Sequence, residues 1–269
     1  MQLTFLGTGT SQGVPVIGCE CEACLSKDPR DKRLRVSVWI EVEGKHFVID
    51  TGPDFRYQML RAAVPRIDAI LITHEHRDHV AGLDDIRPYN FRYAMDMPVY
   101  AVARVQAELR QAFGYIFEAT YPGVPMVLLK NIEKDKPFVV EGIEVIPIEY
   151  FHAELPVMGF RIGNLAYLTD FKTIEADQLE YLKGLDVLII SALQHTEHYS
   201  HLSLTEALEM VEKIAPKRAY LTHISHNMGL SVDTEKLLPS NVFLAYDGLQ
   251  VKSDSPILKG QTPPSQNKT

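Results

Sequence analysis

The feature that most constrains this chain is a short run of metal-binding residue types that follows an apolar stretch typical of a buried strand. The run is Thr73-His74-Glu75-His76-Arg77-Asp78-His79, and imidazole and carboxylate are groups that zinc and similar divalent ions prefer. His74 and His76 are two positions apart, so in extended backbone they point to the same side, whereas the adjacent Asp78 and His79 can turn toward a second point. One loop can therefore serve two metals. The alternative is a polar loop with surface histidines, which would need this pattern to follow a strand by chance.

This H-x-H-x-D-H run resembles the signature of the metallo-β-lactamase superfamily of binuclear metallohydrolases. The resemblance covers about residues 1–252, and it points most to the PhnP-like phosphodiesterases. It implies an α/β fold, an αββα sandwich of two mixed β-sheets flanked by helices, with the metals at one edge. We therefore expect a single hydrolase domain over residues 1–252. Residues 253–269 are rich in Pro, Ser, Gln and Lys and are expected to form a disordered tail.

The resemblance also implies further ligands at the ends of later strands. His152 follows an apolar strand, Asp170 follows a hairpin, and His223 follows the last core strand. A lone histidine is more often structural, but His74 and His76 still need a third partner. Asp170 matches the bridging carboxylate of the superfamily, because two oxygens can bind two ions. The implied active-site ligands are His74, His76 and His152 for one metal, Asp78, His79 and His223 for the other, with Asp170 shared.

All three cysteines fall in one tight motif, Cys19-Glu20-Cys21-Glu22-Ala23-Cys24. An odd number at this spacing is a poor disulfide framework and a good zinc knuckle, which still needs a fourth ligand. The PhnP-like resemblance supplies that ligand as His226, giving one structural zinc that fastens a long loop to the C-terminal half. The alternative is three free thiols.

Two residues have expected catalytic roles through the resemblance. His201 lies in a loop just before a helix, where PhnP-like and tRNase Z enzymes place a histidine that protonates the leaving group or stabilises the phosphoryl transition state. Asp78 is expected to orient the nucleophile while it binds metal. Asp50 is expected to support the ligand loop through hydrogen bonds to its imidazoles. His46, His195 and His198 match no such position and are taken as packing or loop residues.

Composition narrows the classes of function. A net charge of −8 disfavours a protein that coats a long polyanion, so strong nucleic-acid binding is not expected. No apolar run is long enough for a membrane span, and the first residues resemble a strand rather than a signal peptide, so we expect no membrane association and a cytoplasmic location. Thiolate ligands fit a reducing compartment. The related enzymes are often dimers, so a homodimer is possible.

The resemblance therefore predicts a metal-dependent hydrolase, a phosphodiesterase in which a hydroxide bridging two zinc or manganese ions attacks small cyclic or nucleotide-like phosphodiesters. The first alternative is a tRNA 3′-processing endonuclease, which shares the ligands and His201, although no insertion resembling its tRNA-gripping arm is present. The second is a non-hydrolytic iron or redox protein on the same scaffold, although its di-iron members typically carry a carboxylate where His76 stands.

Some segments give weaker expectations. Residues 114–136, with Pro122, Gly123 and Pro125, are expected to be irregular, and residues 242–251 to form a final hairpin. Residues 84–95 and 114–136 have no assigned role at the site. Within the first of these, the stretch from Arg87 to Arg92 is as consistent with a solvated loop as with a substrate contact.

Overall fold

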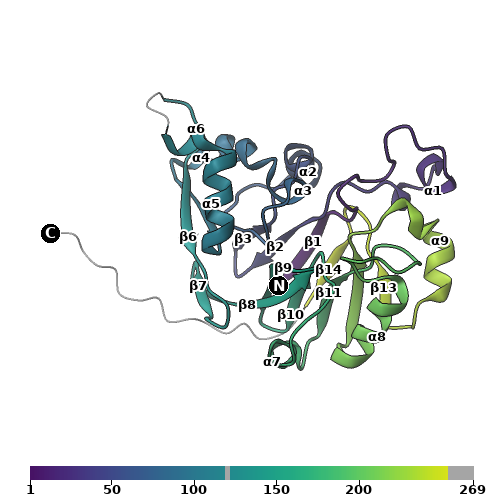
Figure 1. Ribbon diagram of the computed structural model, residues 1–269. Helices are drawn as coiled ribbons and strands as arrows, with labels where there is room; N and C mark the ends of the chain where they lie inside the picture. Colours follow the sequence, from purple (N-terminus) through teal and green to yellow (C-terminus); the bar gives the residue numbers. More distant parts are fainter. Residues whose placement is uncertain (119–121, 254–269) are drawn as a thin grey trace.

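The computed structural model describes residues 1–118 and 122–253. Two seven-stranded β-sheets face each other, and helices cover their outer sides (Figure 1). This is the αββα sandwich that the resemblance to the metallo-β-lactamase superfamily implied. Of the predicted tail 253–269, residues 254–269 lie outside the described part of the chain. Within the described ranges, no helix is both long and apolar enough to cross a membrane.

The first sheet comes mainly from the N-terminal half of the chain. Its strands, in spatial order, are β14 (Gln250–Lys252), β1 (Gln2–Gly7), β2 (Ser37–Val42), β3 (Lys45–Ile49), β4 (Ala69–Leu71), β5 (Met97–Ala101) and β6 (Val127–Asn131). Pairing is antiparallel from β14 to β3 and parallel from β3 to β6, so the sheet is mixed.

The second sheet repeats this plan with the later strands. In spatial order they are β13 (Val242–Leu244), β12 (Arg218–Thr222), β11 (Val187–Ser191), β10 (Leu165–Leu168), β9 (Leu155–Ile162), β8 (Ile143–His152) and β7 (Phe138–Val140). Pairing is antiparallel from β7 to β10 and parallel from β10 to β13. The parallel strands of both sheets need crossover connections, which place helices on the outer faces.

Short helices fill most of the connections. The α-helices are α1 (Glu22–Leu25), α2 (Phe55–Ala62), α3 (Arg77–Val80), α4 (Arg87–Tyr93), α5 (Ala103–Ala112), α6 (Gly114–Glu118), α7 (Ala176–Leu179), α8 (Leu204–Ile214) and α9 (Ser231–Thr234). The 3-10 helices are η1 (Pro29–Asp31), η2 (Leu83–Ile86), η3 (Glu180–Leu182), η4 (His226–Met228) and η5 (Glu235–Leu237).

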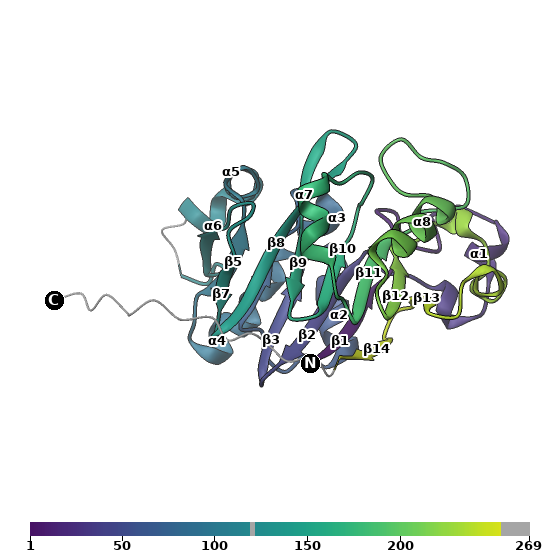
Figure 2. The same ribbon diagram turned by 90° about the horizontal axis from the view of Figure 1, so that it is seen from below.

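Three apolar layers hold the sandwich together. The middle layer lies between the sheets, where Phe5 and Phe47 of the first sheet belong to one cluster with Phe160 and Tyr167 of the second. A second layer packs α2 and α5 on the outer face of the first sheet, and a third packs α7 and α8 on the outer face of the second. Figure 2 shows α8 over β11 and β12 and, on the other side of the molecule, α5 near β5. Because β11 is a central strand with both faces buried, it is an unbroken apolar run ending in a buried serine.

Several local predictions are confirmed and others are wrong. The helix expected just after His201 is present as α8, and a capping box opens it: Ser203 Oγ accepts from the Glu206 N–H, and the Glu206 carboxylate accepts from the Ser203 N–H. Residues 114–136 are not simply irregular, because they contain α6 and the edge strand β6. Residues 87–93 form α4 rather than a loop. The final hairpin over 242–251 is wrong: β13 pairs with β12 in the second sheet, whereas β14 pairs with β1 in the first.

Candidate metal centre

The candidate ligands are delivered by four strands from both sheets. His74 lies three residues after the end of β4, His152 is the last residue of β8, Asp170 lies two residues after β10, and His223 directly follows β12. β4 belongs to the first sheet and the other three strands to the second. The two sheets therefore meet at one edge of the sandwich in a cluster of imidazoles and carboxylates.

Asp170 lies at the centre of this cluster, and its two oxygens face different histidines. Oδ1 lies 3.2 Å from His79 Nε2 and 3.3 Å from His223 Nε2. Oδ2 lies 4.0 Å from His74 Nε2. Asp78 Oδ2 lies on the Oδ1 side, 3.3 Å from His79 Nε2 and 3.9 Å from His223 Nε2. One carboxylate thus separates two groups of ligand atoms.

Hydrogen bonds on the far side of the rings orient the imidazoles. His79 Nδ1–H donates to Asp50 Oδ2 at 2.7 Å, and His152 Nδ1–H donates to the Ser200 carbonyl oxygen at 2.8 Å. His74 Nδ1 lies 3.0 Å from the hydroxyl of Thr73, which itself donates to Asp50. Because carboxylate and carbonyl oxygens only accept, Nδ1 carries a hydrogen in His79 and His152, and Nε2 is the nitrogen directed toward a metal.

The ligand atoms fall into three overlapping groups, in each of which they lie within 4.8 Å of one another. The groups are Asp78, His79, Asp170 and His223; His74, His76 and Asp170; and His152, Asp170 and His201. The first matches one expected ligand set completely. His152 was expected beside His74 and His76, and its ring centroid lies 6.1 and 5.3 Å from theirs, but the tighter group pairs it with His201.

These residues fit divalent metal ions. His74 Nε2, His79 Nε2 and His223 Nε2 are buried and make no hydrogen bond within residues 1–118 and 122–253. Buried polar atoms normally have a partner, and leaving one without costs about 1–3 kcal/mol. Three such atoms directed at two carboxylates match the nitrogen and oxygen donors of zinc and related ions.

The charges of the cluster stabilise one another. Burial alone would lower the pKa of His79, but the charges of Asp170 and Asp78 raise that pKa well above its ordinary value. Burial would raise the pKa of Asp170, but His223 and His79 hold it well below its usual range. The pKa of His74 is lowered, by burial and by the charge of His79. The carboxylates and the imidazole of His79 therefore stabilise one another's charged forms.

His201 lies against this cluster with a buried ring. Its ring centroid lies 4.3 Å from that of His152 and 4.8 Å from that of His223. Burial and the charge of His223 lower the pKa of His201 to about 2. A neutral imidazole at pH 7 donates a hydrogen bond but is a poor proton donor, so the electrostatics favour the stabilising role over the protonating one.

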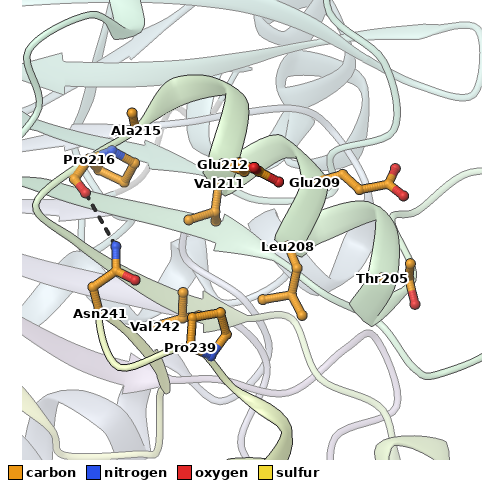
Figure 3. Close-up of a pocket in the computed structure, with 10 residues that line it drawn as sticks. All are labelled: Thr205, Leu208, Glu209, Val211, Glu212, Ala215, Pro216, Pro239, Asn241 and Val242. Atoms are coloured by element: carbon orange, nitrogen blue, oxygen red, sulfur yellow. Dashed lines mark hydrogen bonds between the residues drawn. The ribbon is translucent and has the colours of Figure 1, made fainter.

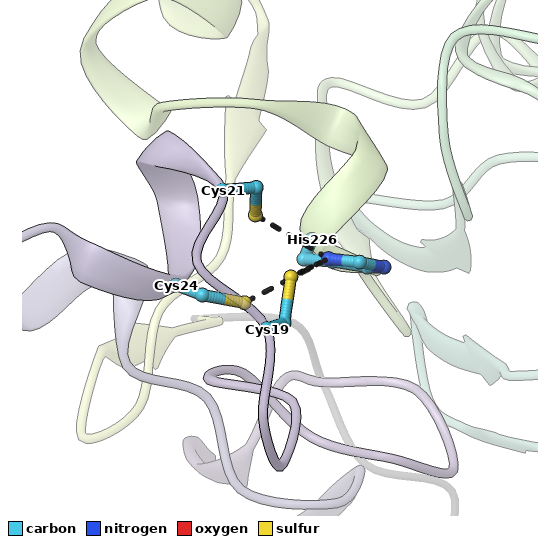
Figure 4. A group of neighbouring side chains, drawn as sticks. All are labelled: Cys19, Cys21, Cys24 and His226. Carbon is cyan, nitrogen blue, oxygen red and sulfur yellow. Dashed lines mark hydrogen bonds between the residues drawn. The ribbon is translucent and has the colours of Figure 1, made fainter.

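The cysteine motif forms a second, separate cluster with His226 (Figure 4). The sulfurs of Cys19, Cys21 and Cys24 lie 3.3, 3.4 and 3.7 Å from His226 Nδ1. A tetrahedral zinc with bonds of about 2.3 Å to sulfur and 2.0–2.1 Å to nitrogen places those atoms about 3.6 Å apart. The cluster therefore fits a zinc ion. It joins the loop before α1 to the start of η4.

The backbone at the active-site cluster adopts uncommon conformations. Asp50, Asp170 and His223 each directly follow or nearly follow a strand and have φ of 65°, 54° and 55°. Left-handed backbone at a residue other than glycine costs roughly 1–3 kcal/mol and often marks a functional site. The ligand loop also passes very close to Gly52, where a Cβ would lie 2.1 Å from the Asp78 carbonyl oxygen.

A cavity of about 310 Å³ opens onto the cluster. Its lining includes six of the candidate residues together with Thr10, Ser11, Leu193, His198, Tyr199 and Ser200. Thr10 and Ser11 belong to the loop that follows β1. A larger cavity of about 550 Å³ lies between α8 and residues 239–242 (Figure 3), and no histidine or cysteine is among its lining residues. The chemistry therefore belongs to the smaller cavity.

Some residues of the site were not expected from the sequence. Thr73 links His74 to Asp50, and its position directly before the first histidine was the available signal. Ser200 acts through its backbone carbonyl, which no side-chain pattern reveals. His198 and Tyr199 line the cavity, although His198 was taken as a loop histidine. By contrast, His46 stacks on Trp39 in the first sheet and lies apart from the cluster.

Comparison with known proteins agrees with this geometry. The model of the β-lactamase superfamily domain matches residues 45–224. A crystal structure of a diphosphatase from the PhnP family is 42% identical, covers 93% of this chain and 96% of its own, and superposes with a TM-score of 0.87. A ribonuclease Z from Anoxybacillus flavithermus is 25% identical over 92% of this chain and 96% of its own length.

An octanoyltransferase from Porphyromonas gingivalis is 40% identical over 94% of this chain. The match covers 52% of that protein, so this chain spans about half of its length. The superfamily match and the extended similarity to the PhnP-family structure agree with the observed sandwich. The chain belongs to the metallo-β-lactamase superfamily of hydrolases and, within it, to the PhnP family.

Proposed function

We propose that this chain is a binuclear-metal phosphodiesterase that cleaves small cyclic or nucleotide-like phosphodiesters. The observation that carries the proposal is the placement of Asp170, whose Oδ1 faces His79 and His223 while Oδ2 faces His74. A carboxylate with its oxygens directed at two groups of imidazoles can bind two ions at once. A single metal ion would need only one of these two groups of imidazoles.

The residues divide between the two ions. His74, His76 and His152 would hold one, Asp78, His79 and His223 the other, with Asp170 shared. When bound, two divalent ions such as zinc or manganese would acidify a water molecule and stabilise negative charge on phosphoryl oxygens. In the second, separate cluster, Cys19, Cys21, Cys24 and His226 would hold a structural zinc.

The protein groups position the substrate around those ions. Asp78 has one oxygen toward His79, and its carboxylate also lines the cavity, so it can orient the attacking water. His201, kept neutral by its surroundings, can donate a hydrogen bond to a phosphoryl or leaving-group oxygen. Since a neutral imidazole protonates an alkoxide poorly, leaving groups of low pKa should react fastest.

Size and charge support a small substrate. The cavity, at about 310 Å³, is near the lower end of ligand sites, which span about 300–1,000 Å³. The net charge of −8 disfavours a grip on a long polyanion such as tRNA. The similarity to a PhnP-family diphosphatase favours attack at phosphorus, and it makes diphosphate diesters, whose phosphate leaving group has a low pKa, a second candidate class.

Metal analysis and a phosphodiesterase assay test the proposal together. Wild type should contain about three metals per chain and hydrolyse bis-p-nitrophenyl phosphate, whereas precursor tRNA should remain uncut. Asp170→Asn should lose active-site metal and at least about 100-fold in rate, since it loses the shared anionic ligand. Asp233→Asn, on the exposed side of α9 in an ion pair with Lys236, is the matched control.

Three results would count against the proposal. Full metal occupancy without hydrolysis of any phosphodiester or diphosphate diester would indicate that the protein hydrolyses another class of ester. Efficient cleavage of precursor tRNA would favour the tRNA-processing alternative. Iron with a characteristic optical spectrum, together with no hydrolysis, would indicate a redox protein.

A further inference from the structure

Tyr199 is an exposed aromatic residue at the mouth of the cavity that holds the candidate metal ligands. The residue is 81% exposed, yet it lines the same cavity as Asp78, Asp170 and His223. The folded chain gains little from leaving a tyrosine ring in water, because the ring buries almost none of its apolar surface. A ring in that position is available to a ligand that enters the cavity.

The ring of Tyr199 is the outermost of a series of rings that leads out of the site. His201 and His223 lie 4.8 Å apart between centroids, His201 and His198 lie 5.3 Å apart, and His198 and Tyr199 lie 4.8 Å apart. Exposure rises along the series from 1% at His223 and 8% at His201 to 81% at Tyr199. A ligand with its phosphate at the buried end would therefore meet the tyrosine with its opposite end.

The loop that carries Tyr199 is held in place on both sides. At its neck the Leu193 N–H donates to the Leu202 carbonyl oxygen at 2.9 Å, and the Leu204 N–H donates to the Gln194 carbonyl oxygen at 2.8 Å. Next to the tyrosine, the Ser200 N–H donates to His198 Nδ1 at 3.3 Å. Because the loop is already ordered, binding a ligand costs little conformational entropy for positioning the ring of Tyr199.

We propose that Tyr199 is a specificity residue that stacks on the nucleobase of a nucleoside phosphate ester whose phosphate occupies the metal cluster. This rests on the proposed function for the phosphoryl subsite. The cavity is small and lined largely by polar side chains, so the flat apolar base lies at its mouth, against the ring of Tyr199. Stacking tolerates any base, because each base has a π-face. The substrate class is thus nucleoside phosphodiesters or diphosphate diesters rather than sugar or alkyl ones.

The test measures binding of two probes that differ only in the base, AMP and ribose 5-phosphate, to the metal-loaded protein by calorimetry. Wild type should bind AMP about 5- to 100-fold more tightly than ribose 5-phosphate, as expected for one base–aromatic stack. Tyr199→Ala should bring this ratio close to one by weakening AMP alone. Tyr199→Trp should keep the ratio. Phe91→Ala, which removes an aromatic side chain of 60% exposure that does not line the cavity, should change neither affinity.

Equal affinity of wild type for the two probes, or a Tyr199→Ala effect of the same size on both, would overturn the inference. So would failure of both probes to bind at millimolar concentration. Hydrolysis of bis-p-nitrophenyl phosphate by the same preparation is measured in parallel. Base-dependent binding without that hydrolysis would overturn the proposed reaction and support the nucleobase site, whereas hydrolysis without base-dependent binding would do the reverse.

Discussion

His79 donates through Nδ1–H to Asp50 Oδ2 at 2.7 Å, and neither side chain is exposed to solvent. Asp50 also accepts from the backbone N–H and the hydroxyl of Thr73, so one buried carboxylate orients the imidazole of His79 and the residue that contacts His74. The two groups of ligands that share Asp170 on their Nε2 side are therefore also connected through Asp50 on their Nδ1 side.

Asp50→Asn should weaken active-site metal binding by about 10- to 100-fold, because an amide cannot accept from both His79 and Thr73 as a carboxylate does. Metal titration of the chelator-treated protein measures the change. Asp68→Asn, which alters another buried carboxylate that accepts from the His46 N–H, is the control and should leave metal affinity unchanged. Unaltered affinity in Asp50→Asn would show that the carboxylate does not orient a ligand.

Gly52→Ala should displace the ligand loop. Its Cβ would lie 2.1 Å from the Asp78 carbonyl oxygen, and backbone rather than a flexible side chain would have to move. We expect loss of active-site metal and a destabilisation of roughly 1–3 kcal/mol, measured by metal content and denaturant unfolding. Gly114→Ala is the matched control, since its new Cβ would meet only a carboxylate oxygen at 4.0 Å. A fully metallated Gly52→Ala protein would contradict the close packing.

Cys21→Ser should lower the metal content from about three to about two per chain while leaving the active-site ions in place. The protein should unfold at a lower temperature, because zinc binding at such a site stabilises the fold. Metal analysis and thermal unfolding measure both effects. Two or fewer metals in fully loaded wild type would rule out the cysteine-ligated site.

Metal binding to the active site at pH 7, in protein whose cysteine cluster already holds zinc, should release at least about one proton, the one on His79. The nearby carboxylates raise the pKa of that imidazole well above its ordinary value, so it is charged before metal arrives and must be neutral afterwards. Calorimetry in buffers of different ionisation enthalpy counts the proton. No buffer dependence at pH 7 would mean that His79 was already neutral.

The central part of the site could be predicted because its ligands lie close together in the sequence. His74, His76, Asp78 and His79 form a pattern that follows a strand, and the three cysteines form another. His152, Asp170, His223 and His226 are isolated residues, and only the similarity to a known superfamily connected them to those patterns. Their proximity depends on how four strands of two sheets are aligned, which single-chain periodicity does not specify.

The errors have a similar origin. β13 and β14 are separated by Asp247-Gly248, a pair typical of a hairpin turn. They lie in different sheets because β13 pairs with β12 and β14 pairs with β1, which local sequence does not indicate. β6 lies at the edge of the first sheet with a half-exposed pattern, so its apolar signal is weak. Tyr199 could not be identified because an exposed aromatic residue in a loop has no periodic pattern.

The pairing of β14 with β1 places the last described strand beside the first. In a chain that grows from its N-terminus, β1 emerges early but keeps one edge open until residues 250–252 have left the ribosome. His223 is also synthesised long after His74 and Asp78, so neither the first sheet nor the metal cluster can be completed before these later residues are present. The open edge of β1 is a site where newly made chains could pair with one another. Closure of the first sheet and binding of metal therefore become possible at nearly the same stage of synthesis, once residues 223 and 250–252 are available.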